Sequence, residues 1–200
     1  MSLPIPSTVH EITPEWLTAV LRAHGVLGPG AVSHAAAEPF GTGQIGDCYR
    51  LEITYSQAEP SAPATLVAKL PAADPGSRGM GFTYGLYSTE VRFYQELAAR
   101  LTIRTPVPYF AAMATTGERF LLLLEDLSPA VTCDQISGCT IEQACLVADQ
   151  AAALHASSWD DPQILGLDWI RSSHEKWLAF LGVFAQAEPV FRERYGRELE

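Results

Sequence analysis

Three glycines spaced as G-x-G-x-x-G, Gly41, Gly43 and Gly46, are the residues of this sequence whose spacing first suggests chemistry. Glycines in this pattern let the backbone approach phosphate groups closely, either in a dinucleotide-binding turn or in a loop that covers a nucleoside triphosphate. The dinucleotide turn opens a helix, whereas the triphosphate loop joins two strands. Residues 48–55 alternate between apolar and polar side chains, which is typical of a strand. The sequence therefore favours a loop over a triphosphate; a dinucleotide oxidoreductase and a plain flexible hairpin turn are the alternatives.

Lys69 is the second candidate, because the sequence has only two lysines and this one lies inside an apolar run. Residues 66–70 otherwise resemble a buried strand, and a buried ammonium group is costly unless an anion meets it. Glu90 follows 21 residues later, beside the apolar stripe of a predicted helix over residues 87–101. In kinases a lysine binds the α- and β-phosphates and a glutamate pairs with it. We expect Lys69 and Glu90 to form such a pair; a lysine at a strand edge and a solvated glutamate are the alternative interpretation.

The third candidate is the segment in which four consecutive leucines, residues 121–124, run into Glu125, Asp126 and Leu127. The leucine run predicts a buried strand, and the polar residues after it predict that the strand ends there. In the kinase arrangement this point is the hinge, where backbone groups bind adenine. The carbonyl of Glu125 and the N–H of Leu127 are the expected groups.

Five segments, in their order along the chain, resemble the aminoglycoside phosphotransferase-like superfamily and, within it, the ecdysteroid-kinase-like, choline-kinase-related branch: GTGQIGDCYRLEITY, LVAKLP, TEVRFYQELA, FLLLLEDL and AAALHASSW. The resemblance covers roughly residues 12–169. It implies a protein-kinase-like fold and phosphorylation, by ATP with Mg²⁺, of a hydroxyl group on a small molecule. It also implies the ATP-binding residues: Gly41, Thr42, Gly43, Gln44, Ile45 and Gly46 over the phosphates, Lys69 bound to them, Glu90 holding Lys69, and Glu125 to Leu127 as the hinge.

One element of the family pattern is missing from these 200 residues. Such kinases carry an H-x-D-x-x-x-x-N segment, whose Asp positions the acceptor hydroxyl and whose Asn helps to hold Mg²⁺. His155 is followed by Ala156 and Ser157, so this stretch resembles a helix end. We therefore expect the catalytic Asp and the Mg²⁺ ligands beyond Glu200. The chain is then the ATP-binding portion of a kinase, inactive alone; the alternative is a non-catalytic ATP-binding or regulatory module completed by a partner chain.

The helices and strands expected from the sequence have to position these residues. Together they indicate an α+β fold that corresponds to the N-terminal lobe of a protein kinase. An antiparallel sheet and one helix over it form that lobe, and the first helices of an incomplete C-terminal lobe follow. We place the nucleotide-binding lobe, with a leading helix, at residues 1–127, and the linker with the helical part at residues 128–200. The expected elements are helices over 14–24, 87–101, 140–158 and from 173, strands over 31–40, 48–55, 65–70, 109–114 and 119–124, and a mobile loop over 71–81.

Composition narrows the functional classes. Hydrophobic residues make up 48% of the chain, so a sizeable core can form. The formal net charge of −10 argues against a nucleic-acid or anionic membrane surface, which needs clustered Lys and Arg. The cysteines and histidines show none of the usual zinc spacings, so we expect no metal site.

The remaining expectations concern location and partners. The longest apolar stretch, residues 177–185, is far shorter than the ~20 residues that span a bilayer, so a cytoplasmic protein is expected. ATP and a small molecule with a hydroxyl group are the expected ligands. Trp177, Leu178, Leu181 and Phe184 recur at helical spacing. We expect a second copy of the chain or a complementing C-terminal fragment to cover this apolar face.

Overall fold

A computed structural model describes residues 3–41, 43–57, 60–117, 119–131 and 136–198; the side chains of residues 171–177, 179, 180 and 198 lie outside this description. The chain divides into two compact units, Met1–Trp159 and Asp160–Glu200. The predicted boundary after Leu127 stays a prediction. The candidate residues of the glycine loop, the lysine strand, the helix and the hinge all belong to the first unit.

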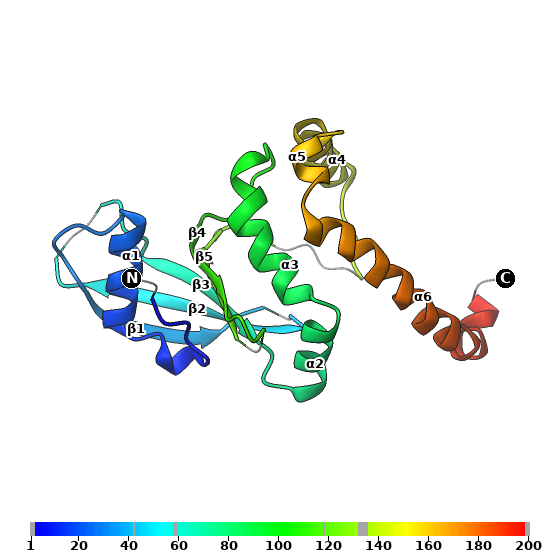
Figure 1. The fold of residues 1–200 in the computed structure, drawn as a ribbon, viewed down its shortest axis with the longest axis horizontal. Helices are drawn as coiled ribbons and strands as arrows, with labels where there is room; N and C mark the ends of the chain where they lie inside the picture. Colours follow the sequence, from blue (N-terminus) through cyan, green and yellow to red (C-terminus); the bar gives the residue numbers. More distant parts are fainter. Residues whose placement is uncertain (1–2, 42, 58–59, 118, 132–135, 199–200) are drawn as a thin grey trace. The chain divides into compact units, whose positions relative to one another are not determined.

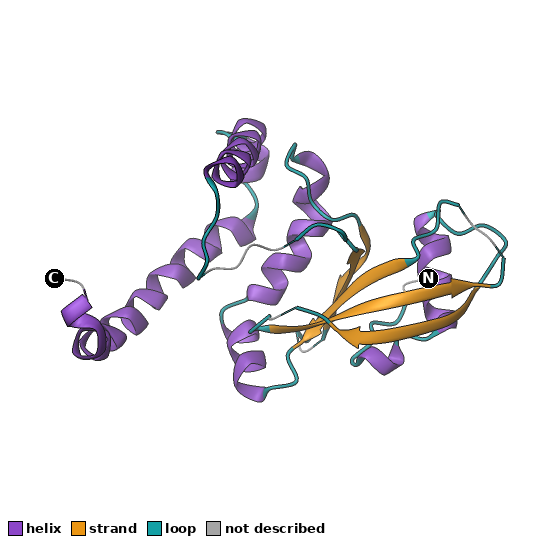
Figure 2. Ribbon diagram, turned by 180° about the vertical axis from the view of Figure 1, so that it is seen from behind, coloured by secondary structure: helices purple, strands orange, loops and turns teal. Residues whose placement is uncertain are grey.

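The first unit is built on one antiparallel sheet of five strands, drawn in orange in Figure 2. The strand order is β1-β2-β3-β5-β4. This arrangement confirms the α+β class and the antiparallel sheet expected for a kinase-like N-terminal lobe. The strands are β1 (Val32–Pro39), β2 (Gly46–Tyr55), β3 (Thr65–Pro71), β4 (Pro108–Met113) and β5 (Phe120–Glu125).

Alternation along the strands gives the sheet two apolar faces. Leu121 and Leu123 belong to a core that includes Leu17 and Leu21 of helix α1 (Pro14–His24). The neighbouring residues of β5 face the other way: Phe120, Leu122 and Leu124 pack in a second core with Tyr87 and Val91 of helix α3 (Leu86–Arg92). Since strand side chains have a period of two, β5 contributes to a core on each face of the sheet. Val67 and Lys69 of β3 alternate with the residues of the first core and therefore lie on the α3 side.

Helix α1 forms where its capping residues predict it. The side chain of Thr13 accepts a hydrogen bond from the N–H of Trp16, and Pro14 occupies the first turn. Gly25 ends the helix with a φ of 86°, a left-handed conformation that favours glycine. The predicted helix over residues 14–24 is therefore confirmed.

The segment between β3 and β4 differs in part from its prediction. Residues 75–83 form helix α2 (Pro75–Thr83), so the predicted loop over residues 71–81 is wrong. Asp74 caps this helix by accepting a hydrogen bond from the N–H of Ser77, and Pro75 starts it. The predicted helix over residues 87–101 is present in three pieces: α3, a π-helical turn at Phe93–Leu97 and a 3₁₀ turn at Ala98–Arg100.

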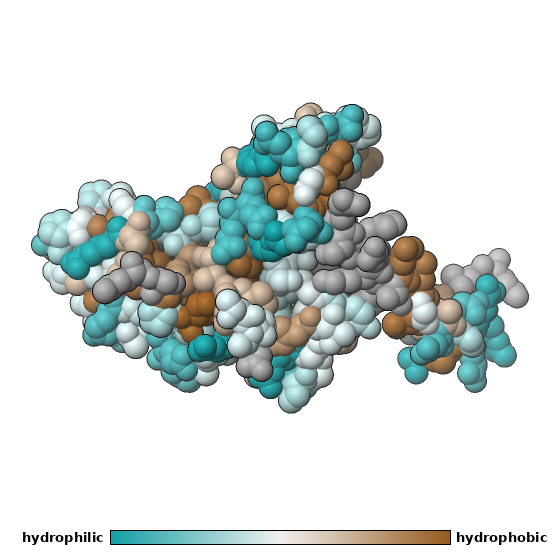
Figure 3. All heavy atoms as spheres, in the orientation of Figure 1, coloured by the Kyte–Doolittle hydropathy of each residue, from teal (hydrophilic) through white to brown (hydrophobic). Residues whose placement is uncertain are grey.

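Helix α4 (Ile141–Ser158) completes the first unit, and α5 (Pro162–Leu165) and α6 (Asp168–Tyr195) form the second (Figure 1). The predicted capping box is present, because Thr140 and Gln143 satisfy each other's backbone N–H groups. Several apolar side chains of α6 are exposed: Leu178, Leu181, Phe184, Val190 and Phe191. Figure 3 shows hydrophobic atoms, in brown, on the part of the surface that this helix forms. Association through this face stays a prediction. Within the described residues, no helix is both long and apolar enough to cross a membrane.

Candidate functional site

The structure brings Lys69 and Glu90 together. The Nζ atom of Lys69 lies 2.7 Å from both carboxylate oxygens of Glu90. Ala68 and Leu70, the neighbours of Lys69, belong to the core on the α1 side of the sheet. Since strand side chains alternate, Lys69 points to the other face, where Glu90 lies. Both paired side chains remain about a quarter to a third exposed, at 26% and 32%. An anionic ligand can therefore approach the ammonium group.

The glycine loop joins β1 to β2, and the backbone geometry explains why glycine occupies positions 41, 43 and 46. Gly41 has a φ of +77°. A Cβ on Gly43 would lie 2.8 Å from the carbonyl oxygen of Gly46, and a Cβ on Gly46 would lie 3.1 Å from Lys69 Cε. The loop thus closes on itself and rests on the stem of Lys69. Thr42, one of the predicted phosphate-binding residues, lies outside the described residues.

The element that follows the glycines distinguishes a dinucleotide-binding turn from a loop that covers a triphosphate. Gly46 is the first residue of strand β2, which pairs with β3 from Gly46↔Pro71 onward. A dinucleotide fingerprint needs a helix at this place, with its N-terminus at the pyrophosphate. The loop therefore joins two strands, as a triphosphate-covering loop does, and does not open a helix.

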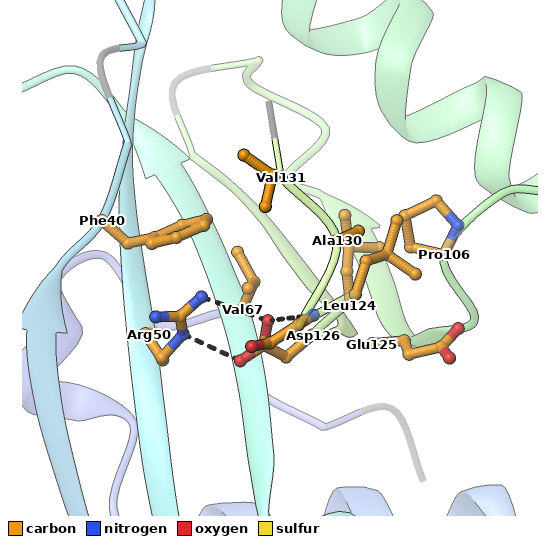
Figure 4. A pocket seen from close by; sticks show the side chains of 11 residues that line it. Phe40, Arg50, Val67, Pro106, Leu124, Glu125, Asp126, Ala130 and Val131 are labelled. Atoms are coloured by element: carbon orange, nitrogen blue, oxygen red, sulfur yellow. Dashed lines mark hydrogen bonds and ion pairs between the residues drawn. The ribbon is translucent and has the colours of Figure 1, made fainter. Parts of the chain in front are cut away.

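A cavity of about 280 Å³ lies at the predicted hinge. This volume is close to the lower end of typical ligand cavities, about 300 Å³. All three predicted hinge residues line it, including Glu125 and Leu127, whose backbone groups are expected to bind adenine. Figure 4 shows the ring of Phe40 on one side and Leu124, Ala130 and Pro106 on the other. The complete lining is Phe40, Arg50, Val67, Pro106, Leu124, Glu125, Asp126, Leu127, Ser128, Ala130 and Val131.

A second cavity, of about 250 Å³, is lined by the glycine loop and the strand residues beside it. Gly41, Gly43 and Gly46 contribute to it together with Cys48 and others. Phe40 also lines the cavity at the hinge, and the two cavities therefore both border on this residue.

An ion pair within the hinge cavity was not expected from the sequence. Arg50 Nε lies 2.8 Å from Asp126 Oδ2, and Arg50 Nη2 lies 3.3 Å from Oδ1 (Figure 4). The Cζ atom of Arg50 also lies 4.3 Å from the centroid of the Phe40 ring, a cation–π contact. The alternation of β2 places Arg50 on the same face as Gly46 and Cys48. That alternation is the one signal from which its position could have been found.

The two carboxyl groups of the hinge have different partners. Glu125 accepts hydrogen bonds from Arg104 Nη2 at 2.6 Å and from the N–H of Val107 at 3.0 Å. The Arg104 hydrogen bond and the Val107 N–H lower the pKa of Glu125 below its ordinary value of 4.5. Asp126 is almost completely buried, with 3% of its side chain exposed. Burial alone would raise its pKa, but the N–H of Ser128 and the Arg50 guanidinium outweigh burial and lower the pKa below 3.8.

Because the pKa of Asp126 is lowered in the folded state, we expect the protein to lose stability at acidic pH. A carboxyl group with a lowered pKa stabilises the folded state above its ordinary pKa, here 3.8, and this contribution disappears as the pH falls through the lowered pKa. We expect the urea midpoint of the wild type to fall as the pH decreases below about 4. Asp126→Asn should flatten this decrease, whereas Asp149→Asn, at an exposed position of α4, should not. Equal slopes for wild type and Asp126→Asn would contradict the prediction.

Among the residues that the structure describes, no set of three or more His, Cys, Asp or Glu side chains is placed to hold a metal ion. The site therefore consists of the glycine loop, the Lys69–Glu90 pair and the hinge cavity with its Arg50–Asp126 pair.

Residues 41–160 match the family model described as the ecdysteroid kinase-like family. The matched range holds 120 of the 200 residues (160 − 41 + 1) and includes the glycine loop, Lys69, Glu90 and the hinge. Comparisons with curated proteins and with solved structures gave no match.

Proposed function

Because this chain belongs to the ecdysteroid kinase-like family, we propose that it binds ATP as the nucleotide-binding part of a phosphotransferase acting on a hydroxyl group of a small molecule. The family supports a kinase-like phosphotransferase. The assignment of ATP to this particular site, and of each residue to a part of ATP, is the proposal.

The observation that carries the proposal is the position of the Lys69 ammonium group. Glu90 holds it at 2.7 Å, and the stem of Lys69 contacts the base of the glycine loop at Gly46. A fixed positive charge beside a loop of closely approaching backbone is the arrangement that binds phosphate groups in kinases. Lys69 would bind the phosphate oxygens, and Glu90 would keep its side chain in place.

The hinge cavity supports the placement of the base. Val67 and Leu124 provide apolar walls from the sheet, and Phe40 provides an aromatic wall beside the glycine loop. Apolar and aromatic side chains can pack against the faces of a planar ring, while backbone groups can form hydrogen bonds with the polar atoms at its edge. The carbonyl of Glu125 would accept a hydrogen bond from the adenine amino group, and the N–H of Leu127 would donate one to a ring nitrogen.

Mg²⁺ is the cofactor that the family implies, and it neutralises charge on the phosphates during transfer. The residues that the structure places do not form a metal site, so towards the phosphates they offer the glycine loop and Lys69. The sequence also lacks an H-x-D-x-x-x-x-N segment. The non-catalytic alternative, an ATP-binding module completed by a partner chain, uses this same site and differs only in the absence of phosphate transfer.

Filling the hinge cavity tests the proposed function. In Val67→Phe the larger side chain would occupy the space of the base while leaving Lys69 and Glu90 in place. We expect isothermal titration to detect Mg-ATP binding by the wild type and a loss of at least about tenfold in affinity for Val67→Phe, equivalent to about 1.4 kcal/mol.

Val190→Phe is the matched control, because Val190 is an exposed residue of α6 in the second unit. It should bind Mg-ATP as tightly as the wild type. A folded wild type that binds no Mg-ATP would refute the proposed function. Equal affinity in Val67→Phe and wild type would show that the base does not occupy this cavity.

A further inference from the structure

Tyr87 lies where the glycine loop, strand β3 and helix α3 meet. Its hydroxyl group donates a hydrogen bond to the carbonyl oxygen of Ile45 in the loop. The same hydroxyl accepts a hydrogen bond of 3.3 Å from the N–H of Ala72, just after β3. A phenol can do both at once, because its oxygen carries one donor and free lone pairs. None of these contacts has a part in the function proposed above.

The ring of Tyr87 is held in place on all sides by its surroundings. The side chain is only 1% exposed, and its ring centroid lies 4.5 Å from that of Phe120 and 4.9 Å from that of Phe82. A Cβ added to Gly81 would lie 2.2 Å from the Tyr87 ring, so this place in α2 requires glycine. Burial raises the pKa of the Tyr87 hydroxyl, which therefore stays protonated and able to donate at neutral pH.

Helix α3 contacts the glycine loop by two routes. Tyr87 and Glu90 are three residues apart and share one face of the helix. Tyr87 reaches the loop directly at Ile45. Glu90 reaches it through Lys69, whose stem lies against Gly46. The loop and the lysine that would bind the same phosphates are thus held by one face of one helix.

We propose that Tyr87 is a positioning residue that ties the glycine loop to helix α3, so that the loop and the Lys69–Glu90 pair keep one geometry for phosphate binding. The consequence for nucleotides rests on the proposed function. The tie itself does not, because it is a property of the chain without ligand.

Amide hydrogen exchange of the free chain tests the tie. Tyr87→Phe removes the hydroxyl and keeps the ring, so the aromatic packing stays. We expect faster exchange of the amides of residues 43–46 and of Ala72, with strands β3 and β5 of the same sample protected as in the wild type. Tyr55→Phe is the matched control, because it removes a partly buried hydrogen bond of 2.6 Å to the carbonyl of Pro63, away from the glycine loop.

Two results would overturn the proposal. In one, the loop amides of Tyr87→Phe exchange as slowly as in the wild type. In the other, loop and strand amides gain exchange to the same extent, which would make Tyr87 a core residue only. Gly81→Ala provides a second variant that displaces the ring but keeps the hydroxyl, and it should also release residues 43–46.

A nucleotide series then tests the consequence. Tyr87→Phe should weaken ATP and ADP binding by about threefold to tenfold, the range that corresponds to one hydrogen bond, and should leave adenosine binding unchanged. Equal weakening of all three ligands would contradict a role at the phosphates. A wild type that binds none of them would refute the proposed function, while hydrogen exchange would still decide the role of Tyr87.

Discussion

Replacing Lys69 with methionine is expected to weaken the binding of Mg-ATP by about 10- to 100-fold, the range that corresponds to losing a hydrogen bond to a charged group. Methionine keeps an unbranched stem, which can still lie against Gly46, and removes only the ammonium group. The phosphates would then face Glu90 without the cation that offsets it. Isothermal titration of Mg-ATP into the variant measures this loss directly.

Two further variants make this experiment specific. Lys176→Met removes the only other lysine, in α6 of the second unit, and should leave the affinity unchanged. Glu90→Gln keeps Lys69 but removes the negative charge that holds it, so we expect a smaller loss than in Lys69→Met. An affinity for Mg-ATP that is the same in Lys69→Met and in the wild type would refute the assignment of Lys69 to the phosphates.

Phe120→Ala is expected to lower the free energy of unfolding by about 3–5 kcal/mol. Phe120 is completely buried in the core between the sheet and α3, and its ring packs on that of Tyr87. Removing the ring costs its transfer from water and leaves a cavity beside the tyrosine. Total stabilities of domains are about 5–15 kcal/mol, so this loss is a large share of the whole.

Urea denaturation of the chain checks the second prediction. Phe184→Ala removes the same ring at an exposed position of α6 and, at a protein concentration at which the chain is monomeric, should change the free energy of unfolding by no more than about 0.5 kcal/mol. The comparison therefore isolates burial from the chemistry of the substitution. Similar midpoints for Phe120→Ala and Phe184→Ala would show that the second core does not stabilise the fold as the structure indicates.

Much of the fold is predictable from residues that are near one another in the chain. The strand after the glycines is visible from alternation, and α1 and α4 from their capping residues, because these signals act within a few positions. Two helices were not predicted: the short helix α5, and α2, where the glycines of the segment suggested a loop. The stronger signal was Asp74 before Pro75, an N-cap followed by a favoured first residue.

The candidate site is predictable in part. The glycines, Lys69, Glu90 and the hinge residues stand out because their order matches a known arrangement, and the structure brings the lysine and the glutamate within 2.7 Å. Their roles in binding ATP stay predictions. The residues that surround them did not stand out, since Arg50 resembles any polar residue of an alternating strand and Tyr87 any apolar residue of a helical stripe.

The sequence by itself determined the family, the class of fold and the order of the five strands, because each depends on local spacing or on the succession of motifs. Only the tertiary structure decided that Arg50 meets Asp126, 76 residues away, and that Tyr87 meets the carbonyl of Ile45, 42 residues away. The physical reason is that such contacts depend on strand register and on which face each helix covers. Shifting one strand by a single residue would turn every side chain to the other face.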